Sequence, residues 1–119
     1  MALLDGTGTL SGAAQSLLTL LFPGTGAPGS PNEVGGRNDV ACNFVSLQPD
    51  GAGSNAMFIG TSSALTTAAY GIRLPAPAAG VPPAPYVLGA WSDKGPVRLS
   101  NIFVIGTAAE KIHVLYDYW

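Results

Sequence analysis

Ile59-Gly60-Thr61 and Ile105-Gly106-Thr107 are two copies of one tripeptide, and each copy closes a short apolar run. The first run is Ala56-Met57-Phe58-Ile59 and the second is Ile102-Phe103-Val104-Ile105. An apolar run that stops at a glycine followed by small residues is typical of a β-strand that ends in a turn. Because this pattern occurs twice in one small chain, it predicts an all-β scaffold.

Glycine and proline divide the chain too finely for long helices, since 16 glycines and 10 prolines are spread over 119 residues. Only the stretch 10–22 combines helical spacing of apolar residues with few breakers, so we expect at most one short helix, near 13–21. Ser11 is a possible cap for that helix. Two strand pieces around Ser11-Gly12 are the alternative, because the threonines before them favour a strand.

Further strands are expected where apolar and β-branched residues lie between turn signals. The expected strands are 41–48, 56–60, 70–74, 86–91, 97–99, 101–105 and 111–118. We expect the last two to form a closing hairpin, with a tight turn at 106–110 in which Gly106 takes a positive φ. The chain is therefore expected to be one domain, 1–119, with a β-sandwich or jelly-roll-like fold of about six to eight short strands.

Two Pro/Gly-rich segments separate these strands. Residues 23–39 are expected to form an extended loop, which is unusually long for a compact domain and is therefore either mobile or laid on a neighbouring subunit. Residues 75–85 are expected to be an extended, polyproline-like surface segment. This second segment is either a stiff loop packed on a neighbour or a ligand for a groove on a partner.

Charged side chains are scarce. They make up 10% of the chain, against about 25% in typical domains, while 47% of the residues are hydrophobic. This balance predicts a surface partly covered by other subunits; a monomer coated with small polar residues is the alternative. The net charge of −2 and the scattered basic residues argue against nucleic-acid binding. The apolar run 17–22 is too short for a membrane span of about 20 residues.

Residue types that carry catalysis are sparse as well. His113 is the only histidine and Cys42 the only cysteine, which are too few for a zinc site. No Ser-His-Asp set can be built around His113 from the sequence. Cys42 is expected to be a buried, inert thiol, and Asp50 is expected to form a turn. The sequence therefore predicts no enzyme, no metal and no cofactor.

Aromatic residues gather in the last expected strand, where alternation places Tyr116 and Tyr118 on one face and His113, Leu115 and Asp117 on the other. Aromatic and proline side chains, and one loop arginine, are the candidates for contacts between subunits. These interface candidates are Trp91, Tyr116, Tyr118, Trp119, Arg37, Pro82 and Pro83. For the two tryptophans, a place in the core is the alternative.

Four segments carry a family resemblance: 8–17, 55–62, 71–75 and 99–116. Together they resemble small virion proteins of tailed bacteriophages. The resemblance implies a β-sandwich structural protein, and within that class a capsid decoration (cement) protein. Such a protein stabilises the shell from its outer surface. The implied partners are the major capsid protein and further copies of the chain, as a homotrimer. The implied location is the capsid surface of the virion, after synthesis in the host cytoplasm.

Two other functions stay open. One is a structural protein of the tail, or a head-fibre or adaptor protein, which would present a recognition surface to the host or to other fibres. The other is a carbohydrate-binding β-sandwich module for host attachment. In that module Tyr86, Trp91, Tyr118 and Trp119 would form a stacking platform for sugar rings.

Overall fold

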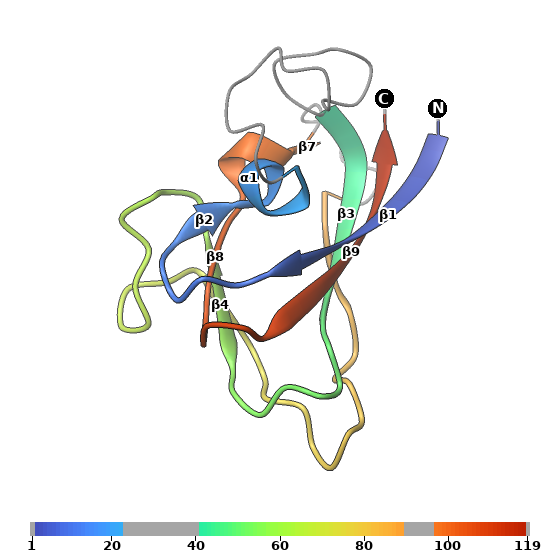
Figure 1. Cartoon of the computed structure of the whole chain (residues 1–119). Helices are drawn as coiled ribbons and strands as arrows, with labels where there is room; N and C mark the ends of the chain where they lie inside the picture. The colour runs from blue at the N-terminus through green and yellow to red at the C-terminus, as the bar shows by residue number, and fades with distance from the viewer. Residues whose placement is uncertain (1, 23–40, 90–96, 119) are drawn as a thin grey trace.

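The computed structural model describes residues 2–22, 41–89 and 97–118, with backbone only for Ala2 and Tyr118 (Figure 1). This part of the chain forms an all-β sandwich, as expected from the sequence. Its elements are β1 (Ala2–Thr9), β2 (Gln15–Ser16), α1 (Leu17–Leu21), β3 (Ala41–Pro49), β4 (Met57–Gly60), β5 (Ile72–Leu74), β6 (Tyr86–Leu88), β7 (Val97–Arg98), a 3-10 helix (Leu99–Asn101), β8 (Phe103–Ile105) and β9 (Lys111–Tyr118).

The strands form two antiparallel sheets that pack on each other (Figure 1). Sheet A has the order β1-β9-β3-β6, with β7 also paired to β3, and sheet B has the order β2-β8-β4-β5. Of the strands in the described ranges, β2 and β7 are only two residues long. The remaining seven agree with the expected number of short strands.

The two strands that end in Ile-Gly-Thr are neighbours in sheet B. In the β4–β8 ladder Ile59 pairs with Val104 and Gly60 pairs with Phe103. Both members of the first pair are buried. The repeated tripeptide thus marks two adjacent strands that end at opposite ends of one antiparallel ladder.

The expected closing hairpin is wrong, because β8 and β9 belong to different sheets. Both edges of β8 are already occupied, by β2 and β4, so β9 crosses to sheet A and pairs with β1 and β3. The crossing begins with a tight turn, in which the Glu110 amide donates to the Thr107 carbonyl at 3.2 Å. Gly106 does not have a positive φ there; Ala109 does, at 73°.

The N-terminal stretch contains both of the alternatives weighed from the sequence, a strand and then a short helix. The cap of α1 is Ser16 rather than Ser11, since the Ser16 Oγ accepts from the Thr19 amide at 3.2 Å. Two glycines of β1 let the helix approach: a Cβ at Gly6 would lie 2.8 Å from a methyl group of Leu21, and one at Gly8 would lie 3.1 Å from the Cβ of Leu20. The helix therefore covers the inner side of β1.

Side chains from both sheets and from α1 form one hydrophobic core. Its buried members are Leu10, Leu17, Leu20, Cys42, Val45, Leu47, Met57, Ile59, Leu74, Leu99, Ile102, Val104, Ile112, Val114 and Tyr116. The burial of Cys42 agrees with the sequence prediction. Strict alternation along the strand would place Cys42 on the opposite face from Val45, but the ladder shifts register between these residues. This irregularity brings both side chains to the core.

Residues 75–85 are not a continuous polyproline-like segment. Ala79 and Gly80 both have positive φ, at 52° and 79°, and the Val81 amide donates to the Ala78 carbonyl at 2.9 Å. These features make a tight turn between two proline-containing arms. The expected loop 23–39 lies outside the described residues.

The turn before β9 gives a test of backbone strain. Ala109 has a left-handed φ that disfavours any side chain, whereas its neighbour Ala108 does not. We expect Ala109→Gly to raise the free energy of unfolding by about 0.5–1 kcal/mol, because glycine adopts this conformation without steric cost. Ala108→Gly, the matched control, is expected to lower it by a similar amount. Urea denaturation of both variants measures their free energies of unfolding. A destabilised Ala109→Gly protein contradicts the assignment of a strained, left-handed backbone to Ala109.

Candidate interaction surface

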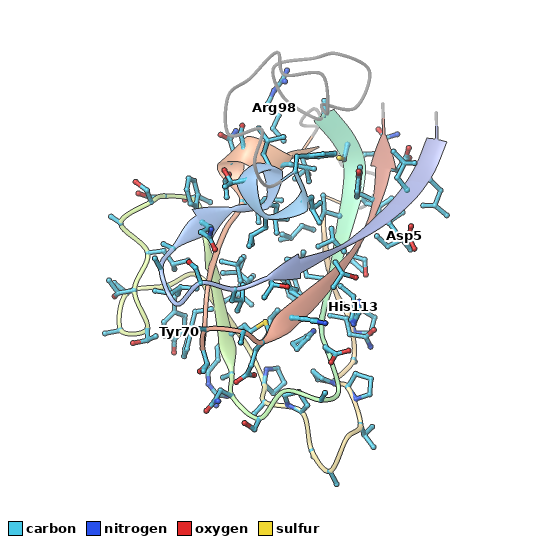
Figure 2. The ribbon with its side chains drawn as sticks, in the orientation of Figure 1. Asp5, Tyr70, Arg98 and His113 are labelled. Carbon is cyan, nitrogen blue, oxygen red and sulfur yellow. The ribbon has the colours of Figure 1, made fainter. Side chains whose placement is uncertain are left out.

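One side of sheet A faces away from sheet B, and we call it the outer face. Antiparallel partners point their side chains to the same side of a sheet, so the strand registers define its members. They are Leu3, Asp5, Thr7 and Thr9 of β1, Lys111, His113 and Leu115 of β9, Ser46 and Gln48 of β3, and Val87 of β6. Figure 2 shows Asp5 and His113 on this side of the molecule, and Tyr70 on the other side.

The middle of the outer face is a row of four side chains that crosses sheet A. Asp5 pairs with Leu115, Leu115 with Ser46, and Ser46 with Val87. The exposed fractions of Leu115 and Val87 are 40% and 47%, and that of Leu3, near the end of β1, is 64%. Large aliphatic side chains thus alternate with polar ones on an open sheet surface.

A shallow hollow of about 360 Å³ lies along this row. Its lining combines polar groups of Asp5, Ser46 and Gln48 with the apolar surfaces of Pro85 and Leu115. The proline belongs to the segment before β6, so this segment forms one wall of the hollow. The outer face and the proline-containing segment are therefore one continuous surface.

A chain of hydrogen bonds crosses the same face, and two of its members, Thr7 and His113, also line the hollow. The Nε2 of His113 lies 2.7 Å from the Oδ1 of Asp50, and its Nδ1 lies 3.1 Å from the Oγ1 of Thr7. Asp50 also accepts from the Ala52 amide at 3.2 Å, which confirms its expected role in a turn. His113 therefore joins β1, β9 and the turn after β3.

This chain has the residue types of a nucleophile-histidine-acid set, which sequence analysis did not find around His113. Such a set needs a nucleophile and an oxyanion site around one reacting atom, in a position shielded from water. Here the side chains of His113 and Asp50 are 45% and 33% exposed, and the described residues place the group on an open strand surface. Its geometry is suited to holding three elements in register.

Glu110 makes a second polar link, between the start of β9 and the loop before β4. Its Oε1 accepts from the amides of Ser54 and Asn55 at 3.1 and 3.2 Å, and its Oε2 accepts from the Asn55 side chain at 2.6 Å. The bond from the Asn55 side chain, and then the backbone bonds, hold the pKa of Glu110 below its ordinary value. No sequence pattern points to this link, because the partners of Glu110 lie more than 50 positions away.

Asp117 departs from the expected alternation in burial. It was placed on the same face as His113 and Leu115, yet only 3% of it is exposed. Its Oδ2 accepts from the Asn43 side chain at 3.0 Å, while its Oδ1 has no partner within the described ranges. Asp117 therefore faces the same side as its neighbours in alternation but is covered rather than exposed.

The interface candidates from the sequence are distributed unevenly. Tyr116 is 3% exposed and belongs to the core, so its prediction as an interface residue is wrong: the inward face of β9 needs a large apolar side chain there. Burial raises the pKa of its hydroxyl.

Pro82 is exposed, and Pro83 is half-buried with its carbonyl accepting from the Gln48 side chain at 2.8 Å. Arg37, Trp91 and Trp119, and the side chain of Tyr118, lie outside the described residues.

The sugar-stacking platform considered from the sequence is described only at Tyr86, which is 37% exposed. Its three other members are among the side chains just named, so this platform stays a prediction. Within the described ranges, histidine, cysteine and carboxylate side chains form no group of three that could hold a metal ion. The helices described there are too short to cross a membrane.

Acid sensitivity follows from the two polar links. Asp50, whose pKa is lowered chiefly by its bond to His113, and Glu110 both have pKa values below the ordinary 3.8 and 4.5. A carboxyl group whose pKa is lower in the folded than in the unfolded protein stabilises the fold at any pH above its unfolded-state pKa. This stabilisation is lost as the pH falls through the folded-state pKa. We expect Glu110→Gln to lower the free energy of unfolding by about 1 kcal/mol at neutral pH, a modest figure because the group is close to solvent.

The difference in free energy of unfolding between wild type and Glu110→Gln should shrink as the pH falls from about 5 to about 3. Over this range the wild-type Glu110 carboxylate becomes protonated and loses its own stabilising effect. Urea denaturation of both proteins across this range is the measurement. A deficit that is unchanged in acid contradicts the role given to the Glu110 carboxylate.

Comparison with known proteins gives no further guide: family models, curated proteins and solved structures contain no match to this chain. Its function is therefore argued from its own residues.

Proposed function

We propose that this chain is a bacteriophage capsid decoration protein that binds the outer surface of the shell and stabilises it through contacts between subunits. Its partners in this proposal are the major capsid protein and further copies of itself, expected to form a homotrimer. The phage-like segments recognised in the sequence motivate the class, and the outer face of sheet A supports the mode of binding.

The observation that carries the proposal is the exposure of aliphatic side chains in the centre of a rigid sheet. Leu115 and Val87 are 40% and 47% exposed and lie in one row of paired residues. Single exposed aliphatic residues are common on any protein. Here they share a row with Asp5 and Ser46, in a chain with only 10% charged residues, and this combination favours a surface that is covered in the assembled state.

The segment before β6 extends this surface. Val81, at its turn, is 64% exposed, and Pro82 beside it is also exposed. Gln48 ties the segment to β3 through the Pro83 carbonyl. A stiff, proline-containing segment loses little conformational entropy when it docks, so it can add contact area to the outer face at low cost.

The proposal is tested by binding to shells of the parent phage that lack the protein, with co-sedimentation as the readout. We expect wild type to saturate the shells. Leu115→Glu should weaken binding at least tenfold, because it places a charge in the centre of the contact. Thr67→Glu is the matched control: it adds the same charge at an exposed position of the loop 61–70, which follows β4 in sheet B, and should bind like wild type.

Two outcomes would count against this proposal. Failure of folded wild-type protein to bind such shells overturns the assignment as a decoration protein. Equal binding by Leu115→Glu and Thr67→Glu shows instead that the shell contacts another part of the surface. Circular dichroism of each variant separates a loss of binding from a loss of fold.

A further inference from the structure

β1 is a long strand at the edge of sheet A. It has eight residues and pairs with β9 on one side only. The register runs without a shift from the Ala2–Tyr118 pair to the Thr9–Lys111 pair, so no bulge bends the strand away from a partner. An open edge of this kind presents unpaired N–H and C=O groups that a further strand can use.

The hydrogen bonds just after β1 show which of its groups are open. The Leu10 amide donates to the Glu110 carbonyl, and the Leu10 carbonyl accepts from the Ala109 amide, both at 2.9 Å. Hydrogen-bonded pairs alternate along an antiparallel ladder, so Leu4, Gly6 and Gly8 also bond to β9. The residues between them direct their backbone groups outward; these are Leu3, Asp5, Thr7 and Thr9.

Within the described part of the chain, no residue forms a hydrogen bond with these outward backbone groups. The other strands at sheet edges are short: β2 has two residues, and β5 and β6 have three each. β5 also carries an exposed Arg73, and Pro85 directly precedes β6. Short length, charge and proline are the usual protections of an edge, and β1 has only Asp5.

We propose that β1 pairs antiparallel with β1 of a second copy of this chain, about a two-fold axis at Gly6. In this register Leu3 faces Thr9 and Asp5 faces Thr7 of the other copy. It is the one two-fold register in which all four outward residues of each strand face outward residues of the other. The sheets of the two copies then join into one.

The sequence of β1 is complementary to itself in this register. Each Asp5 carboxylate lies opposite a threonine hydroxyl, whereas an axis at Asp5 would oppose two carboxylates, which is unfavourable. On the inner side, the large Leu4 faces the small Gly8 of the other copy. A partner of unrelated sequence would have no reason to match this pattern, so the second copy is the occupant that the strand itself favours.

Cysteine cross-linking tests the register. Residues that face each other in a hydrogen-bonded pair have Cα atoms about 5.5 Å apart, within the range that a disulfide spans. A mixture of Asp5→Cys and Thr7→Cys proteins should form a disulfide-linked dimer on mild oxidation. A mixture of Thr7→Cys and Thr9→Cys, the matched control, should not, because those positions are offset along the strand. Cys42 is buried and does not interfere.

A proline substitution tests the edge without cross-linking. Thr7→Pro removes an outward N–H that β9 does not use, so sheet A keeps its own ladder. Thr7→Val is the control, because it loses the same hydroxyl bond to His113 but keeps the N–H. We expect Thr7→Pro to weaken self-association at least tenfold relative to Thr7→Val in sedimentation equilibrium. Circular dichroism checks that both variants fold.

Equal self-association of the two Thr7 variants, or equal cross-linking of the two cysteine mixtures, overturns the pairing of β1 strands. A wild-type protein that stays monomeric at high concentration does so as well. None of these readouts involves capsid shells, so edge pairing succeeds or fails separately from the proposed function. The contact has two-fold symmetry, and on a shell it would link one trimer to the next.

Discussion

The position of β9 between β1 and β3 is the constraint on which the rest of the structure depends. β9 is the inner strand that joins the first strand of the chain to the long strand β3. Its inward residues Ile112, Val114 and Tyr116 are all buried in the core shared by the two sheets. Its outward residues His113 and Leu115 provide the centre of the outer face. Packing on one side and a contact surface on the other are therefore set by one alternating sequence.

Local sequence patterns were sufficient to predict most of the strands after residue 40, but not their partners. The long first strand, β1 (Ala2–Thr9), was not among the expected strands; only the threonines before Ser11 pointed to it. The Ile-Gly-Thr repeats, the alternation in β9 and the turn after Pro49 all correspond to observed strands and turns. The expected β8–β9 hairpin failed because a turn signal says only that the chain reverses direction. Whether the next strand has a free edge to pair with depends on distant segments, here β2 and β4, which occupy both edges of β8.

The polar links of the outer face could not be predicted for the same reason. Thr7 and His113 are 106 positions apart, and Asp50 and His113 are 63 apart. No spacing rule connects such residues, and only the ladders of β9 with β1 and β3 bring them together. By contrast, burial of Cys42 and exposure of Pro82 followed from residue type and local context. The position of Cys42 was predictable only in part. Its burial followed from its residue type, but its face of the strand did not, because alternation fails where a ladder shifts register.

The ladder between β1 and β9 also bears on how the protein is made. Thr9 pairs with Lys111, so β1 must wait for about one hundred further residues to leave the ribosome before either of its edges is satisfied. Contacts between such distant segments slow folding, because a large loop has to close before they form. The β1–β9 ladder therefore forms late in synthesis, whereas the β4–β5 pair of sheet B, which is local in sequence, can form early. Until β9 has emerged, β1 has no ladder partner within the described part of the chain.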